Sequence, residues 1–279
     1  MLKLELPEVE TYRRDLEREV LGHKIKAVDV RTLEVTPGIK AKKVFGDAIV
    51  GTKIVAVERV ALTLVLRLDN EQVVAITLGE QGRLLRGATK DKPGAEVVNV
   101  ITFTQGGDLR VIDPEKTTTI HVVHNEQLSE VLPEFSELGL DLHASPISWV
   151  DFGQVVRASS APLKLMLTDP ARFVGIGDVY SNEILFDSGL RHDRPPEQLS
   201  TQEIRRLYRS VAQIVHDSVK YGGTSLPDRP FADLNGKEGE YAEYLAVWGR
   251  VNELSPRSRV PIQKTSFKNQ VVYFCSTQV

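Results

Sequence analysis

The character of the sequence changes near Pro133, and this change constrains the fold more than any other feature. Before it, residues 24–123 consist mostly of short β-rich runs separated by turn-forming residues, the clearest runs being 56–60, 63–68 and 73–78. Many short strands joined by turns predict an antiparallel sandwich or barrel. After it, prolines interrupt stretches with helical periodicity, so a helical region is expected to follow.

Two helices are predicted with well-marked ends. Pro7 suits the first turn of a helix, and Gly22 supplies a stop. Between them, apolar residues recur at helical spacing at Val9, Tyr12, Leu16 and Val20. A second helix is predicted from 200 to 220. Ser200 and Glu203 form a capping box there, and one apolar face is shared by Ile204, Leu207, Val211, Ile214 and Val215.

The last thirty residues return to β-like runs, ending at 270–275. We therefore predict an α+β fold. It comprises an N-terminal antiparallel β-sandwich with a leading helix over residues 1–131, a helical domain over 132–246 and a β-hairpin appendage over 247–279.

Composition narrows the function only a little. Among 279 residues, 41% are hydrophobic and 26% charged, which is typical of a soluble globular chain. No apolar run approaches the ~20 residues of a membrane span, and a signal peptide is not expected. The single cysteine, Cys275, favours a cytosolic protein without disulfides. A net charge of −3 argues against strong nucleic-acid binding, although residues 250–279 carry five basic residues and one acid.

A glycine-rich turn at 175–177 precedes another predicted helix. It lacks the third glycine of a dinucleotide fingerprint and the lysine of a P-loop, so nucleotide binding is not favoured. Two interpretations stay open. Asp178 caps the helix in a purely structural turn, or exposed backbone N–H groups at the helix start hold a phosphate.

Several motifs in a fixed order then carry a resemblance over nearly the full length. They lie at 5–11, 173–186, 188–190, 222–226, 235–237, 247–250 and 273–275. The chain resembles the formamidopyrimidine-DNA glycosylase and endonuclease VIII family. The resemblance implies double-stranded DNA as partner, possibly damaged or abasic, and a helix–two-turn–helix that grips the DNA backbone.

In that family, an N-terminal proline attacks the sugar C1′ of a damaged nucleotide and forms a Schiff base. Leu4 stands at this position, and its amide nitrogen is not a nucleophile. The glutamate that follows the proline is kept as Glu5. The family's catalytic lysine aligns with Leu62. Lys3 is the remaining candidate amine, with a solvated terminal lysine as the alternative interpretation.

The side chains that the family inserts beside a flipped base also differ. The usual methionine is Glu80, the arginine opposite an orphaned base is Glu115, and the aromatic wedge is Thr117. Two acids next to phosphates are unfavourable by Coulomb's law.

The resemblance also implies a set of DNA-contacting positions. The family's phosphate-binding asparagine corresponds to Asp178, and its finger arginine to Gln270. The complete set is Lys164, Gly175, Gly177, Asp178, Tyr180, Arg257, Arg259, Lys264 and Gln270. For Lys164, and for the basic residues of the hairpin, the alternative is an ordinary solvated side chain. The family's four zinc-binding cysteines align with Ser255, Ser258, Cys275 and Gln278, so we expect a zincless finger and no cofactor.

Three functions follow from this pattern. The first is a protein that binds damaged or distorted DNA, without abasic-site lyase activity. The second is a divergent glycosylase of base excision repair that uses Glu5 with Lys3 or with water. The third is a protein-interaction module on the same scaffold. We expect a cytoplasmic monomer without membrane contact, associated with the nucleoid if the protein is bacterial.

Overall fold

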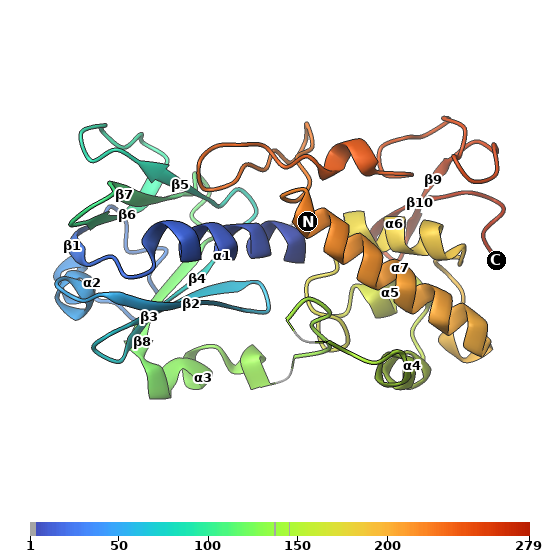
Figure 1. Cartoon of the computed structure of the whole chain (residues 1–279), viewed down its shortest axis with the longest axis horizontal. Coiled ribbons are helices and arrows are strands. Elements are labelled where there is room, and N and C mark those ends of the chain that lie inside the picture. Colours follow the sequence, from blue (N-terminus) through green and yellow to red (C-terminus); the bar gives the residue numbers. More distant parts are fainter. Residues whose placement is uncertain (1–3, 137, 145) are drawn as a thin grey trace. The chain divides into compact units, whose positions relative to one another are not determined.

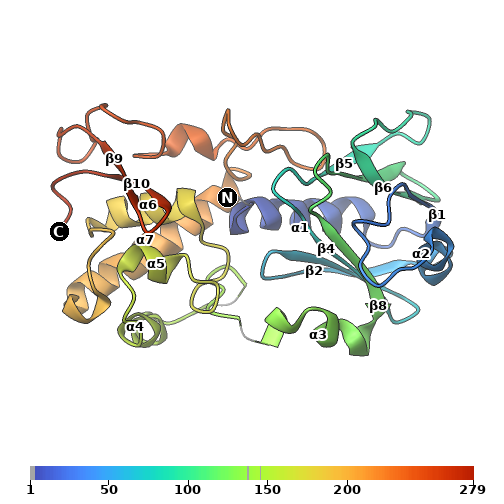
Figure 2. The ribbon, with the colours of Figure 1, turned by 180° about the vertical axis from the view of Figure 1, so that it is seen from behind.

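The structure is a computed structural model, and it describes residues 4–136, 138–144 and 146–279. The chain forms two compact units (Figures 1 and 2). The first contains Met1–Ser136 together with Gly222–Glu240, and the second contains Glu137–Tyr221 together with Tyr241–Val279. The segment Gly222–Glu240 therefore packs in the first unit, whereas we expected it within a helical domain over 132–246.

The first unit is built on two antiparallel sheets of four strands each. One sheet has the order β1 (Ile25–Val30), β6 (Val97–Phe103), β7 (Asp108–Ile112), β5 (Arg83–Gly87). The other has the order β2 (Ile54–Val60), β3 (Thr63–Leu68), β4 (Gln72–Thr77), β8 (Thr119–His124). These strands confirm the predicted runs and the predicted α+β class.

Helices complete the first unit. They are α1 (Leu6–Val20), α2 (Lys42–Ile49) and α3 (Leu128–Val131), with short 3₁₀ turns at Asn125–Gln127 and Pro133–Ser136. Helix α1 lies along the sandwich (Figure 1), and its apolar stripe of Val9, Tyr12, Leu16 and Val20 is buried in the core, as predicted. The helix begins one residue before Pro7, and Gly22 follows its end with φ +81°.

Four buried polar groups at the start of and along α1 bind the returning segment Gly222–Glu240 or strand β5. The Glu8 carboxylate accepts the backbone N–H of Thr224 at 2.8 Å, and the Asp15 carboxylate accepts that of Leu234 at 3.1 Å. The Tyr12 hydroxyl accepts the N–H of Leu84 at 3.3 Å, and its ring meets Phe231 edge-on at 5.2 Å. The fourth, Glu5, lies beside Arg229 in the same segment. Satisfying these buried groups explains why this late segment belongs to the first unit.

The second unit is mainly helical. It contains α4 (Trp149–Arg157), α5 (Leu163–Leu167), α6 (Asp178–Ser188) and α7 (Thr201–Lys220), 3₁₀ turns at Pro196–Gln198 and Tyr241–Tyr244, and the hairpin of β9 (Gln263–Phe267) and β10 (Gln270–Phe274). The capping box of Ser200 and Glu203 is present at α7, and the predicted apolar face of that helix is buried. No helix in the described part of the chain combines the length and apolar character that crossing a bilayer requires.

Removal of the Glu8 carboxylate tests the connection between α1 and the returning segment. Glu8 is 1% exposed and also accepts the backbone N–H of Glu5 at 3.0 Å. We expect Glu8→Ala to lower the free energy of unfolding by about 2–4 kcal/mol, because two buried donors lose their acceptor. Urea denaturation measures the change. The control Glu17→Ala, on the solvent side of the same helix, should cost less than about 1 kcal/mol.

Candidate functional site

Leu4 and Glu5 lie buried at the start of α1. Leu4 is 8% exposed and belongs to the hydrophobic core of the sandwich, and Glu5 is 3% exposed at the N-cap position of the helix. The position that the resemblance assigns to an amine nucleophile is therefore filled by a core side chain. Lys3, the alternative amine, lies outside the described residues.

Arg229 faces the Glu5 carboxylate, with Nη2 3.5 Å from Oε1 and both side chains buried. Paired backbone hydrogen bonds between Leu226 and Arg229, at 3.1 and 3.0 Å, fix this part of the returning segment. The opposite charges offset part of the cost of burying each group. No local pattern in the sequence indicates this pair, because more than two hundred residues separate its members.

A cavity of about 720 Å³ in the first unit brings several of these positions together. Leu4, Glu80 and Arg229 all line it, and two of them, Leu4 and Glu80, were singled out from the sequence. The charged side chains of the lining are mostly acidic. Glu80, Glu96, Asp228 and Glu238 outnumber Arg83 and Arg229.

The two loops that carry the inserted side chains in the family lie against each other. Gly79 donates its N–H to Thr118 Oγ1 at 3.0 Å, and a Cβ on Gly79 would lie 2.0 Å from Thr117 Oγ1, so only glycine fits there. Gln81 donates to the Glu115 carboxylate at 2.5 Å. The loops are thus ordered by contacts with each other, but they present acids.

Leu62 lies in the two-residue turn between β2 and β3. Its neighbour Ala61 has φ +50°, and the Leu62 side chain packs partly buried against the sandwich core. At the position that the resemblance aligns with the family's lysine, the turn therefore carries an apolar contact and no titrating amine.

Lys164 is fully buried in the second unit, which is unusual for lysine. Its Nζ donates to Ser181 Oγ at 2.7 Å and to the Asp178 carbonyl at 3.2 Å, and it lies 3.3 Å from Asp178 Oδ1. The positive charge of Lys164 is therefore matched inside the protein by the Asp178 carboxylate, which the resemblance aligns with the family's asparagine.

The glycine turn before α6 has the geometry of a helix start. Gly175 has φ +69°, and Gly177 occupies the N-cap position, so the interpretation of Asp178 as the cap is wrong. Asp178 is the first helical residue instead. Tyr180 is buried at 1% exposure inside the unit. Gln270, at the position of the finger arginine, exchanges hydrogen bonds with the Thr168 hydroxyl at 2.9 and 3.3 Å.

The four positions aligned with zinc-binding cysteines form a hydrogen-bonded cluster. Ser258 Oγ lies 3.3 Å from Ser255 Oγ and 3.1 Å from Cys275 Sγ. Gln278 accepts the Cys275 backbone N–H at 2.7 Å and donates to the Leu190 carbonyl at 2.8 Å. Hydrogen bonds thus join the segment before β9 to the segment after β10. They lie at the positions that the resemblance aligns with the family's metal ligands.

This donor set does not fit a zinc ion. One thiol, two hydroxyls and one amide lack the thiolates and imidazoles that zinc prefers. Burial would raise the pKa of the Cys275 thiol, but hydrogen bonds with the Ser258 and Thr277 hydroxyls outweigh burial and lower it. Within the described ranges, no group of three or more histidine, cysteine, aspartate or glutamate side chains is placed to hold a metal.

The turn of the hairpin and its attachment to α6 are both fixed by specific residues. Lys268 and Asn269 both have positive φ, as a tight type I′ turn between β9 and β10 requires. Asn182 joins the hairpin to α6, because it donates to the Val271 carbonyl at 3.1 Å and accepts the Tyr273 N–H at 2.8 Å. Figure 2 shows the hairpin beside α6.

The three basic residues in and next to the hairpin that are predicted to contact DNA have different surroundings. Arg257 Nη1 donates to the carbonyls of Phe186 and Asp187, at the C-terminal end of α6, where a cation is favourable. Lys264 lies over the Tyr273 ring at 5.4 Å. Arg259 has φ +57° in the turn that precedes the hairpin and is exposed.

Glu183 is a structural carboxylate that the sequence patterns do not identify. It is 3% exposed and accepts the backbone N–H groups of Ala246, Val247 and Trp248 at 2.7, 3.0 and 2.8 Å. Burial raises the pKa of this carboxyl, and the three donors offset part of that increase. Glu183 therefore holds the chain that leads from the returning segment to the hairpin.

Comparison with known proteins places these features in a family. The formamidopyrimidine-DNA glycosylase N-terminal domain matches residues 4–120, and the formamidopyrimidine-DNA glycosylase H2TH domain matches residues 138–229. The two matches cover more than half of the chain. The chain therefore belongs to the formamidopyrimidine-DNA glycosylase family, a family of DNA-repair glycosylases.

Individual relatives match over almost the whole length. The formamidopyrimidine-DNA glycosylase of Heliobacterium modesticaldum is 30% identical over 97% of this chain and 98% of its own. The MutM (Fpg) protein from Thermus thermophilus has a similar structure, with a TM-score of 0.85, 26% identity and coverage of 98% and 97% of the two chains. Lactococcus lactis Fpg, solved in complex with DNA containing an abasic site, has a TM-score of 0.86 at 24% identity, with 97% of each chain covered.

The hydrogen-bonded cluster at the base of the hairpin can be tested by removing one member. Gln278 is 6% exposed and bonded through both amide atoms. We expect Gln278→Ala to lower the free energy of unfolding by about 1–3 kcal/mol, because a buried donor and a buried acceptor lose their partners. Thermal unfolding measures this change. EDTA should leave the wild-type transition unchanged, and a clear decrease with EDTA would contradict the assignment of a metal-independent hairpin.

Proposed function

We propose that this chain recognises damaged or distorted DNA and does not cleave abasic sites as a lyase. The observation that carries the proposal is the buried Leu4 side chain at the start of α1, where the family places its amine nucleophile. A Schiff base requires an amine with a free lone pair, and the amide nitrogen of Leu4 has none. Leu62 likewise brings no amine to the β2–β3 turn.

The surroundings of Glu5 also favour binding over catalysis. Its carboxylate is buried against Arg229 and is part of the start of α1. A general acid or base must reach the proton that it transfers, within about 3 Å or through one water. The Arg229 guanidinium competes with a sugar or a water for the same carboxylate. Glu5 is therefore better explained as a structural ion-pair partner than as a working catalytic group.

Support for DNA as the partner comes from the family and from the second unit. The Lactococcus lactis protein of the same fold was solved with DNA that contains an abasic site. In this chain, the turn before α6 keeps its backbone donors at a helix start, and residues 250–279 carry five basic residues against one acid. The acids Glu80, Glu115 and Asp178 reduce the attraction for phosphates, so we expect weaker and strongly salt-dependent binding.

The proposal is tested by measuring binding and chemistry on the same DNA. Fluorescence anisotropy with duplexes that contain a tetrahydrofuran abasic analogue, compared with intact duplexes, should show salt-dependent binding that favours the analogue. Borohydride treatment with a natural abasic site should trap no covalent complex, and a panel of oxidised bases should not be released.

Other results would select another function. A trapped complex that disappears in Lys3→Ala would replace this proposal by a divergent glycosylase with Lys3 as nucleophile. Base release without trapping would indicate that Glu5 activates water. Failure to bind any DNA at low salt would exclude DNA recognition and favour a protein-interaction module.

The carboxylate of Asp178 provides a second prediction. Asp178→Asn keeps an oxygen near Lys164 Nζ but removes the negative charge that matches it. We expect this variant to bind duplex DNA roughly threefold more tightly or better at low salt, with a steeper salt dependence, because one phosphate-repelling charge is lost. The control Asp151→Asn, in the first turn of α4, removes an equal charge and should leave affinity unchanged. Equal effects in both variants would show that only net charge matters.

A further inference from the structure

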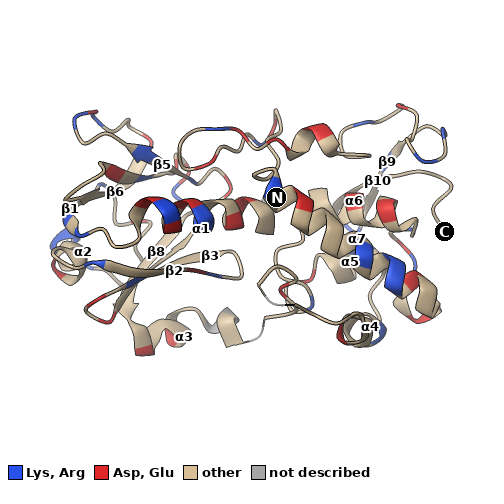
Figure 3. Cartoon of the chain, in the orientation of Figure 1, with Lys and Arg blue, Asp and Glu red and all other residues tan. Residues whose placement is uncertain are grey.

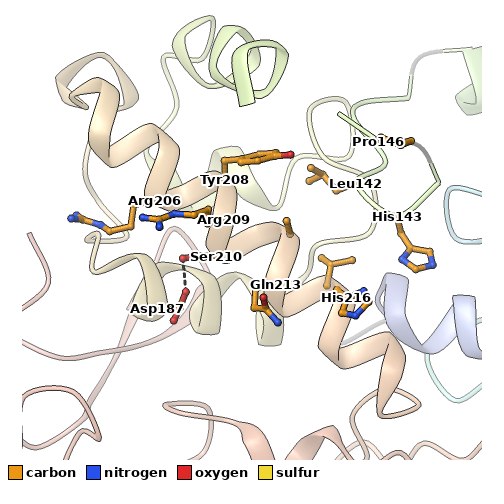
Figure 4. A pocket seen from close by; sticks show the side chains of 12 residues that line it. Leu142, His143, Pro146, Asp187, Arg206, Tyr208, Arg209, Ser210, Gln213 and His216 are labelled. Carbon is orange, nitrogen blue, oxygen red and sulfur yellow. Dashed lines mark hydrogen bonds between the residues drawn. The ribbon is translucent and has the colours of Figure 1, made fainter. Parts of the chain in front are cut away.

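A continuous hollow follows the outer face of α7 in the second unit. A cavity of about 870 Å³ is lined by Leu142, His143, Pro146, Arg206, Arg209 and His216, among others (Figure 4). A second hollow of about 550 Å³ is lined by Trp149, Gln202 and Arg205. The two share Arg206, Tyr208 and Arg209, so they form one groove, which we call the α7 groove.

The charge of the α7 groove is strongly one-sided. Its lining contains three arginines, Arg205, Arg206 and Arg209, against a single acid, Asp187, among the described residues. The Asp187 carboxylate already accepts a hydrogen bond from Ser210 at 2.5 Å. Figure 3 shows blue segments, which mark lysine or arginine, on α7. Such a concentration of like charge on a protein with net charge −3 indicates an anionic partner.

The groove also has a preformed aromatic and apolar lining. The Arg205 guanidinium lies 4.1 Å from the centre of the Trp149 ring, which is 37% exposed. The Tyr208 hydroxyl donates to the Ile147 carbonyl at 2.7 Å, and Arg206 Nε donates to the Ser188 carbonyl. These contacts restrain side chains that would otherwise lose entropy on binding, so the surface is partly preorganised.

We propose that the α7 groove binds an acidic peptide segment of a partner protein, with carboxylates that alternate with apolar side chains. The arginines at 205, 206 and 209 provide the charge, and Trp149, Tyr208, Leu142 and Pro146 provide apolar contact. Exposed tryptophan, tyrosine and arginine are the residues that dominate protein interfaces. A DNA backbone presents mainly phosphates and small sugar C–H surfaces, whereas a peptide can place larger apolar side chains against this lining, so a peptide matches the groove better.

This interaction is separate from the proposed recognition of DNA. All of the groove residues belong to the second unit, and none is among the positions that the family resemblance assigns to DNA contact or catalysis. The groove can therefore bind its partner whether or not the chain binds DNA, and the two ideas fail independently.

The test uses the full chain and a short fluorescein-labelled peptide in which glutamates alternate with leucines. The key variant is Arg205→Glu with Arg209→Glu, two exposed positions whose reversal should not disturb folding. Its matched control is Lys40→Glu with Lys43→Glu, which changes net charge equally on the exposed surface of the first unit. A second variant, Trp149→Ala, removes the aromatic contact without changing charge.

We expect wild type and the lysine control to bind the peptide with similar affinity. The arginine variant should bind about tenfold more weakly or worse, and Trp149→Ala should also weaken binding. Replacing every glutamate of the peptide by glutamine should abolish binding. Absence of peptide binding at low salt, or equal binding by wild type and the arginine variant, would overturn the proposal. A further result would also overturn it: wild type binds no peptide, and the arginine variant loses DNA binding. The groove would then be a phosphate contact for DNA.

Discussion

Two buried carboxylates on one helix, Glu8 and Asp15, organise the first unit. Each accepts a backbone N–H from the returning segment Gly222–Glu240, at 2.8 and 3.1 Å. Because buried donors and acceptors must be paired, these bonds fix both α1 and a stretch of chain far away in sequence. The same segment supplies Arg229 to Glu5 and Phe231 to the core. The geometry around the position of the family's nucleophile therefore depends on a part of the chain that lies beyond α7.

The changed positions also fit together chemically. Three positions that the resemblance singles out carry side chains bonded inside the protein: Asp178 pairs with Lys164, Gln270 bonds to Thr168, and Gln278 bonds within the hairpin base. Hydrogen bonds and ion pairs inside the protein hold these side chains in place. They stabilise the fold whether or not the protein is catalytically active, since fold and activity are separate properties.

Local patterns in the sequence predicted the three clearest strand runs of the sandwich and the helices α1 and α7. The strand runs, the apolar stripe of α1 and the capping box at α7 depend on neighbours within a few residues, and each is confirmed. The pairing of Glu5 with Arg229, the three donors at Glu183 and the burial of Lys164 were not predicted, because they depend on residues brought together only by tertiary packing. The interpretation of Asp178 as the cap of α6 lies one residue too late, since glycine at the N-cap position leaves no side chain to mark it.

The discontinuity of the first unit has a consequence during synthesis. When residues 1–136 have left the ribosome, the sandwich strands are complete, but Glu8 and Asp15 still lack the backbone donors of Thr224 and Leu234. Many further residues, including all of α7, must be made before that segment arrives. The N-terminal unit therefore cannot reach its final state by N-terminal-first folding, the usual order for consecutive domains. Its last step is the docking of a segment synthesised after most of the second unit.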